Sequence, residues 1–508
     1  MQSYLGKELL KFSDKPQDIW RVDDAMKGTA IIGGTGSGKT SASGKAIAHK
    51  FLKEGWGGIV LCAKTDEAKL WEKYCHDTGR GNDYITFTKG AIHKTGEYKD
   101  QEMIFNPIDY EMKREGEGAG ETQNLTNIFM NIYKMGNRIT GDTDVKEERY
   151  WDSALKRCLN RTIELLKLAE EDLSYENMVK IITAAQLVTR ENFIIALVDL
   201  EEDRIDEIDE NHEDGYCMYC LLKAYEELFK GDKEPEEELG NGFLMVEDYF
   251  TKSLPKLDEK TTAIIFESFL GLAEPFLAGI LRRHFSGSTN LFPELTYKEQ
   301  KIIILDFSIK EYLDMGIIGQ CVFKQLFQQA IERRNIEKYP TPVFLWCDEA
   351  QYFVNPYDQI FLTTARSSLT ATVFLSQNIS NYFAIMGSGM DAKAKVNSLM
   401  GNLSTKIFHA NSDAETNEYA SRLIGNSQQQ LSSSNQQHQA FSIMDNYSQG
   451  TSTQYLPQIQ PKEFTTFKTG GEYNDYEVQG VVVVNGKKWS DGKNFIQTTF
   501  KQEFKNKQ

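Results

Sequence analysis

One segment near the start of the chain has the residue types and spacing to bind phosphate: Gly33, Gly34, Thr35, Gly36, Ser37, Gly38, Lys39 and Thr40. Glycines allow backbone angles that other residues avoid, so successive N–H groups can turn towards phosphate oxygens at the start of a helix. In this pattern the Lys reaches the β- and γ-phosphates and the Thr hydroxyl binds Mg²⁺. The apolar run 29–32 precedes the loop and a helix-compatible stretch from Ser41 follows it. We therefore expect residues 33–41 to bind ATP with Mg²⁺.

A pair of carboxylates in the second half of the chain could complete this site. The apolar run 343–347 ends in Asp348 and Glu349. Ligands of open α/β sheets bind at the carboxyl ends of the strands. A nucleotide hydrolase needs one carboxylate to hold Mg²⁺ and a second group to activate water. We expect Asp348 to hold the metal and Glu349 to activate water.

Two further polar residues are candidates for the same site. Gln377 follows the apolar run 371–375, where its amide could sense the γ-phosphate or hold the attacking water; the alternative is a cap for the next helix. Arg366 could neutralise transition-state charge on the nucleotide of a neighbouring subunit; the alternative is a surface salt bridge. Together with Lys39 and Glu349, these two residues are the predicted catalytic groups.

Hydrophobic patterns divide the chain into two kinds of structure. From residue 28 to about 110 apolar strands alternate with amphipathic helices, and strand-like runs return from 301 onwards. Such alternation builds a mainly parallel sheet covered by helices. Between 147 and about 285, apolar residues recur three and four positions apart, which is helix periodicity. We expect an α/β domain formed by residues 1–145 and 291–508, interrupted by an all-α domain at 146–290. Residues 427–437 are rich in Ser, Gln and Asn and predict a mobile loop.

Composition narrows the class of protein. The chain has 508 residues with 40% hydrophobic content, enough for two or three domains with proper cores. A net charge of −17 excludes a surface that binds nucleic acid all over, although it permits a local basic channel. Acidic runs at 201–214 and 234–238 are expected to be solvated.

Neither a membrane span nor a zinc site is predicted. The longest apolar region, 263–281, is interrupted by charges and a proline. Seven Cys at irregular spacing predict a reducing, cytoplasmic setting. Cys217, Cys220 and His212 offer three metal ligands where structural zinc needs four, so packing of the Cys in a helix is favoured.

The order of these motifs resembles the HerA–FtsK superfamily of ring ATPases, and more closely the type IV coupling proteins of conjugation and type IV secretion. The matching segments are residues 33–40, Phe105-Asn106-Pro107-Ile108, Glu148-Arg149-Tyr150-Trp151 with Ala154, Asp348-Glu349, Arg366, Gln377, and Asp413 to Gly425. Two features depart from that family. Its usual N-terminal transmembrane helices are not seen, and its acidic residue in an Asp-x-Lys pattern is replaced by Cys62 while Lys64 is retained.

The resemblance implies a RecA-like P-loop ATPase domain with an inserted all-α domain, active as a ring hexamer. It implies single- or double-stranded DNA, a relaxase or other secreted protein, and type IV secretion components as partners. We expect a cytoplasmic protein that reaches the inner face of the membrane through partners. One alternative is a duplex DNA translocase for segregation or packaging, and another is a nucleotide-gated scaffold with little turnover.

Overall fold

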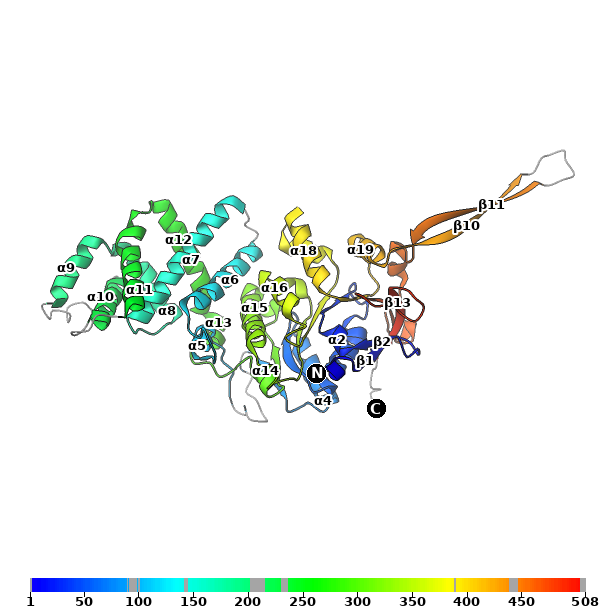
Figure 1. Ribbon diagram of the computed structural model, residues 1–508, viewed down its shortest axis with the longest axis horizontal. Coiled ribbons are helices and arrows are strands. Elements are labelled where there is room, and N and C mark those ends of the chain that lie inside the picture. Colours follow the sequence, from blue (N-terminus) through cyan, green and yellow to red (C-terminus); the bar gives the residue numbers. More distant parts are fainter. Residues whose placement is uncertain are drawn as a thin grey trace.

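The computed structural model describes residues 2–88, 90, 98, 101–140, 145–201, 215–229, 236–387, 390–437 and 446–502. It contains a nine-stranded sheet with helices packed on it and a region made of helices alone, which occupies one end of the long axis (Figure 1). A two-stranded ribbon extends from the opposite end (Figure 1).

The central sheet has the strand order β13-β12-β9-β3-β8-β7-β4-β6-β5. The strands from β9 to β5 are parallel, whereas β12 runs antiparallel to both β9 and β13. Their bounds are Thr29–Ile32 (β3), Gly57–Leu61 (β4), Tyr84–Phe87 (β5), Ile302–Leu305 (β6), Val343–Cys347 (β7), Thr370–Ser376 (β8), Thr405–Phe408 (β9), Glu477–Val484 (β12) and Phe495–Lys501 (β13). The expected α/β class with a mainly parallel sheet is confirmed.

Alternate residues of each strand supply two hydrophobic cores, one on each face of the sheet. In β3, for example, Ile31 belongs to the core that contains helices α3 (Lys45–Lys53) and α4 (Glu67–Asp77). Its neighbours Ala30 and Ile32 belong to the opposite core, which contains α15 (Ile309–Arg333) and continues into the all-helical region. Strands buried on both faces explain the continuous apolar runs in the sequence.

Long helices build the second region. Its elements are α5 (Pro107–Lys113), α6 (Thr122–Thr140), α7 (Val145–Leu168), α8 (Tyr175–Ala184), α9 (Arg190–Glu201), α10 (Tyr216–Phe229), α11 (Glu237–Asp248), α12 (Glu259–Ala273) and α13 (Gly279–Phe285). Helix α6 lies before residue 146 and packs against α7, so helical structure begins earlier than the expected boundary. The all-α region interrupts the α/β region as expected. Of the predicted acidic runs at 201–214 and 234–238, residues 202–214, with His212, and residues 234–235 lie outside the described residues.

Short elements complete the fold around the sheet. Helix α1 (Gln2–Leu5), the hairpin β1 (Glu8–Lys11) and β2 (Ile19–Arg21), and α2 (Val22–Ala25) come before β3. The remaining helices are α14 (Leu295–Lys298), α16 (Pro356–Thr364), α17 (Ser380–Met386), α18 (Met390–Asn402) and α19 (Ala414–Ile424). Among the residues described, no single helix is both long and apolar enough to cross a bilayer.

The prediction of a mobile loop at 427–437 is wrong, because this segment forms a strand. Strand β10 (Asn426–Gln437) pairs antiparallel with β11 (Asn446–Pro457) over twelve residue pairs. The ribbon projects away from both cores (Figure 1). A strand that is not half-buried needs no apolar alternation, so the pattern that reveals other strands is missing here.

Candidate functional site

The phosphate-binding segment adopts a loop between β3 and a helix. Gly36 and Gly38 have φ angles of 74° and 81°, in the left-handed region that favours glycine. The backbone N–H of Ser37 donates to the carbonyl of Gly34 over 3.1 Å and closes the turn. The first helical turn, Thr40–Gly44, is a π-helix that leads into α3. The strand, loop and helix order expected from the sequence is present.

Neighbouring strands hold the loop in place. The N–H of Gly33 donates to the carbonyl of Ser376, the last residue of β8. The N–H of Gly34 donates to the carbonyl of Ala410, which follows β9. Gly38 lies so close to Val478 of β12 that a Cβ at this position would be 2.5 Å from Cγ2 of Val478. The conformation of the loop is therefore fixed by the C-terminal strands as well as by its own glycines.

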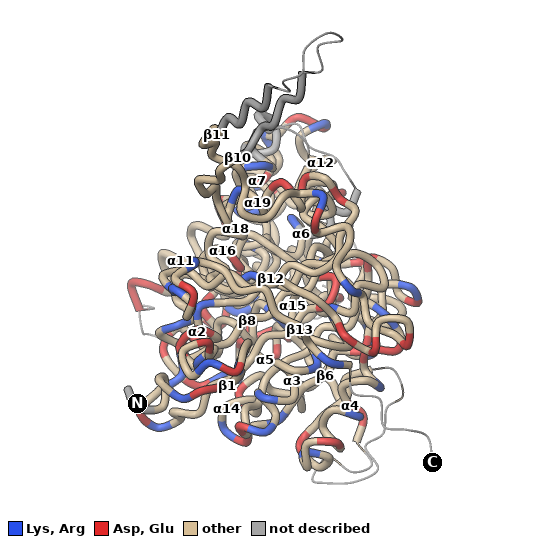
Figure 2. Tube along the Cα trace, turned by 90° about the vertical axis from the view of Figure 1, so that its right-hand side faces the viewer, with Lys and Arg blue, Asp and Glu red and all other residues tan. Residues whose placement is uncertain are grey.

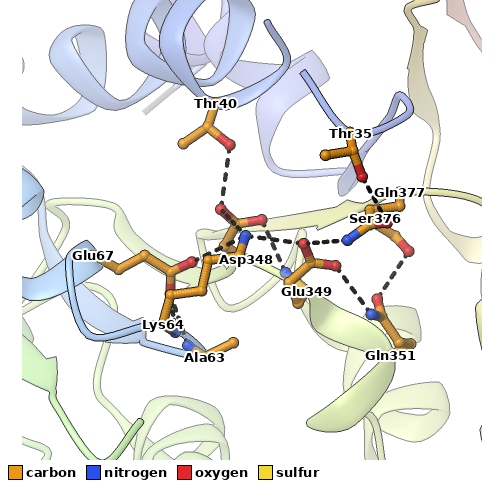
Figure 3. Close-up of polar contacts among 10 residues, drawn as sticks. All are labelled: Thr35, Thr40, Ala63, Lys64, Glu67, Asp348, Glu349, Gln351, Ser376 and Gln377. Atoms are coloured by element: carbon orange, nitrogen blue, oxygen red, sulfur yellow. Dashed lines mark hydrogen bonds and ion pairs between the residues drawn. The ribbon is translucent and has the colours of Figure 1, made fainter. Parts of the chain in front are cut away.

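The two predicted carboxylates reach the loop from β7. Both Asp348 and Glu349 are buried, and the Thr40 hydroxyl donates to Oδ2 of Asp348 over 3.2 Å (Figure 3). Glu349 has φ 47° and ψ 48°, a left-handed conformation that is uncommon for a residue with a side chain. The structure thus brings the predicted Mg²⁺ ligands together, with Glu349 directly beside them.

Three donors fix the Glu349 carboxylate (Figure 3). Lys64 Nζ and Gln377 Nε2 donate to Oε1 over 2.9 and 3.0 Å, and Gln351 Nε2 donates to Oε2 over 3.0 Å. Burial alone raises the pKa of Glu349, but the hydrogen bonds from Gln377, Gln351 and Lys64, with the charge of Lys64, hold this pKa below its ordinary value. Glu349 is therefore an ionised, oriented carboxylate at neutral pH.

Gln377 connects the two halves of the site. It follows β8, the strand that lies between β3 and β7 in the sheet. Its amide nitrogen donates to Glu349, and its amide oxygen accepts a hydrogen bond from the Thr35 hydroxyl over 3.2 Å (Figure 3). A ligand in the loop that moved Thr35 would therefore also affect Glu349 through Gln377.

The chemistry of the loop fits a polyphosphate with Mg²⁺. Lys39 is only 7% exposed, and within the described part of the chain its ammonium makes no ion pair with a carboxylate. The buried Ser37 hydroxyl has no hydrogen-bond partner among the residues that the structure describes. A cleft of about 350 Å³ adjoins the loop and is lined by Thr35, Gln377 and Asn411, among others. Anionic oxygens would satisfy the cation and the hydroxyl.

A magnesium ion in such a site takes few protein ligands. Mg²⁺ usually keeps several waters and binds one or two protein oxygens together with substrate phosphates. The Thr40 hydroxyl and the Asp348 carboxylate would supply these two protein oxygens. The described residues contain no group of three or more His, Cys, Asp or Glu that could hold a metal. Cys217 and Cys220 are buried in α10, and burial raises the pKa of both thiols.

Arg366 lies apart from these groups. Its side chain is 59% exposed and its Nε donates to Asp23 over 2.8 Å. An exposed pair of this kind contributes about 0–1 kcal/mol to stability. Within one chain the structure does not bring Arg366 to the loop, so its predicted action on a neighbouring subunit stays a prediction.

Sequence reasoning did not include two contacts of the site. Lys64 follows β4 as Glu349 follows β7, and these strands are neighbours, so the order of the sheet would have revealed the contact. His409 lies buried behind the loop, where its Nδ1 donates to the carbonyl of Gln479 and its Nε2 accepts from the Ser43 hydroxyl over 2.7 Å. Burial lowers the pKa of His409 to about 4. No sequence signal distinguished it from an ordinary core histidine.

A glycine-rich loop, a carboxylate pair two strands away and an amide on the strand between them lie on a sheet that has the RecA-like P-loop fold. Residues 342–469 match the family model described as the TraM recognition site of TraD and TraG. No curated protein matches the chain significantly.

Solved structures of a bacterial conjugative coupling protein, TrwB, share the fold. Its unbound form has a TM-score of 0.52 at 11% identity, with 99% of this chain and 90% of that chain covered. The form with ADP and Mg²⁺ has the same TM-score and identity and covers 99% and 95%. The form with sulphate has a TM-score of 0.53 at 11% identity, also with 99% and 95% covered. The resemblance to type IV coupling proteins is thereby confirmed, in fold along the chain and in sequence at 342–469.

Proposed function

We propose that this chain hydrolyses ATP. The approach of the Thr40 hydroxyl to Asp348, with the oriented Glu349 beside it, carries the proposal. The oxygen of a water molecule would form a bond to the γ-phosphorus while the bond to the β–γ bridging oxygen breaks, which releases ADP and phosphate. Glu349 would accept a proton from the water, and Gln377 would orient the water or read the γ-phosphate.

The remaining residues of the loop would bind and neutralise the nucleotide. Lys39 would contact the β- and γ-phosphates, and backbone N–H groups of residues 33–41 would surround the phosphate oxygens. Thr40 and Asp348 would hold Mg²⁺, which neutralises phosphate charge during the reaction. A solved structure of TrwB contains ADP and Mg²⁺, which supports a nucleotide with Mg²⁺ as what the loop binds.

We further propose that ATP hydrolysis drives the delivery of DNA, with a bound relaxase or other secreted protein, to a conjugative type IV secretion channel. A ring of six subunits would place the exposed Arg366 of one subunit at the nucleotide of the next. In one view of the chain, Lys and Arg are intermixed with Asp and Glu (Figure 2). DNA would therefore contact a local channel in the ring, since the chain as a whole is acidic.

The family match at residues 342–469 also supports the proposal that the chain binds a protein partner. Its family description names a recognition site for TraM in TraD and TraG. In this chain the segment includes α19 and the ribbon of β10 and β11. We propose that a conjugation protein docks on this segment and that such partners bring the cytoplasmic ring to the inner face of the membrane.

ATPase rates with and without DNA test the proposal. The rate should rise when single- or double-stranded DNA is added, and the mass in solution should be that of a hexamer when ATP is present. Stimulation by duplex DNA with no dependence on a secretion partner would favour the segregation or packaging motor. Slow turnover that DNA leaves unchanged would contradict the motor and favour a nucleotide-gated scaffold.

A further inference from the structure

Three carboxylates and one ammonium group meet at the edge of the sheet beside the loop (Figure 3). Lys64 Nζ lies 2.9 Å from Oε1 of Glu349, 3.6 Å from Oε1 of Glu67 and 4.0 Å from Oδ2 of Asp348. The three acidic side chains are buried, whereas Lys64 is 45% exposed. Lys64 is thus a cation within reach of all three acidic groups. Burial and the neighbouring Asp348 raise the pKa of Glu67 to about 8. At neutral pH the charge of Lys64 therefore acts mainly on Asp348 and Glu349, which would otherwise repel each other.

The turn that carries Lys64 is held rigidly after β4. Oε2 of Glu67 accepts hydrogen bonds from the backbone N–H groups of Ala63 and Lys64 over 2.7 and 3.2 Å. The amide of the buried Gln320 bonds both the N–H and the carbonyl of Cys62 over 2.8 and 3.1 Å. A fixed backbone limits the positions that the Lys64 ammonium can reach, so its contact with Glu349 is well defined.

The contacts of Glu349 leave part of its hydrogen-bond acceptor capacity unused. Each carboxylate oxygen has two acceptor sites. Lys64 and Gln377 use both sites of Oε1, while Gln351 uses one site of Oε2. With respect to the described residues, one acceptor site therefore remains on Oε2, and Lys64 is the only charged donor among these three.

We propose that Lys64 is a positioning residue for ATP hydrolysis. Its ammonium holds Oε1 of Glu349 and offsets the repulsion from Asp348, so that Oε2 stays oriented towards the attacking water. The inference rests on the proposed function, because it assigns Lys64 a part in the step that Glu349 performs. Lys64 acts through Glu349 and not on the nucleotide.

Steady-state kinetics of substituted chains test this role. Lys64→Met removes the charge and keeps the length of the side chain, so kcat should fall about 10- to 100-fold, as is common when a supporting contact of a site residue is removed. KM for ATP should be unchanged, because no ground-state contact with the nucleotide is lost. Lys64→Arg keeps the charge and should retain most of the rate. Lys73→Met, which removes an exposed lysine of α4, is the matched control and should leave kcat and KM unchanged.

A double substitution separates positioning from a structural role. In a Glu349→Gln background, Lys64→Met should cause no further loss of the residual rate, because the group through which Lys64 acts is already changed. An unaltered kcat in Lys64→Met, or a full second loss in the Glu349→Gln background, would overturn the inference while the ATPase proposal stands. A wild-type chain that binds ATP without hydrolysing it would overturn both.

Discussion

Substitution of Gly38 by Ala gives a quantitative test of the packing between the loop and β12. A side chain at φ 81° costs roughly 1–2 kcal/mol relative to glycine. The new Cβ would also lie 2.5 Å from Cγ2 and 3.1 Å from Cγ1 of Val478, which forces an overpacked contact worth about 1–3 kcal/mol. We expect Gly38→Ala to lower the free energy of unfolding by about 2–5 kcal/mol, the sum of these two effects.

Gly36→Ala is the control for the backbone effect alone. Gly36 has a similar φ of 74°, but a Cβ there would meet no atom within 4 Å from the described residues beyond its two chain neighbours. Its substitution should therefore cost only about 1–2 kcal/mol. Urea unfolding followed by tryptophan fluorescence suits the measurement, because Trp20, Trp56 and Trp346 lie in the core beside the loop.

A second substitution can remove the close contact between the added Cβ at position 38 and the Val478 side chain. In a Val478→Ala background the added methyl of Gly38→Ala gains space, and its cost should fall towards that of Gly36→Ala. Equal costs for Gly38→Ala and Gly36→Ala in the wild-type chain would refute the reasoning. So would a Gly38→Ala cost that Val478→Ala leaves unchanged.

Three further outcomes follow from the site. Lys39→Ala should weaken ATP binding by about 1.5–3 kcal/mol, the worth of a hydrogen bond to a charged group, and calorimetric affinities equal to wild type would contradict this. Arg366→Ala should leave ATP affinity intact and slow hydrolysis only in assembled rings, so an equal loss in isolated subunits would exclude action on a neighbour. Because burial lowers the pKa of His409 from 6.5 to about 4, the folded state resists its protonation. The contribution of neutral His409 to the free energy of unfolding is therefore fully present above pH 6.5. This contribution should fall by up to about 3 kcal/mol as the pH drops to 4. His409→Gln should unfold with a smaller pH dependence; an identical dependence would contradict the assignment.

The sequence predicted those parts of the fold that leave a local pattern. Strands β3 and β7 are short apolar runs because both faces of the sheet are covered, and their observed bounds agree with the expected runs 29–32 and 343–347. The ribbon of β10 and β11 was missed for the opposite reason. It lies outside the cores, so neither its polar composition nor its spacing marked it as a strand pair.

Those parts of the site that consist of residues consecutive in the sequence could be predicted from the sequence. Gly33 to Thr40 and Asp348-Glu349 have recognisable sequences, and the structure brings them together. The contacts of Lys64 and His409 depend on which strands are neighbours, and no spacing along the chain encodes this. Arg366 differs again, since its predicted partner belongs to another subunit.

Hydrolysis of ATP by Glu349→Gln tests the central claim most directly. The substituted chain lacks the carboxylate that accepts the proton from water, but keeps Lys39, Thr40 and Asp348. It should bind ATP with Mg²⁺ as tightly as the wild-type chain while hydrolysis falls by about 100- to 10,000-fold, the range for loss of a general base. Hydrolysis at the wild-type rate by Glu349→Gln would contradict the account.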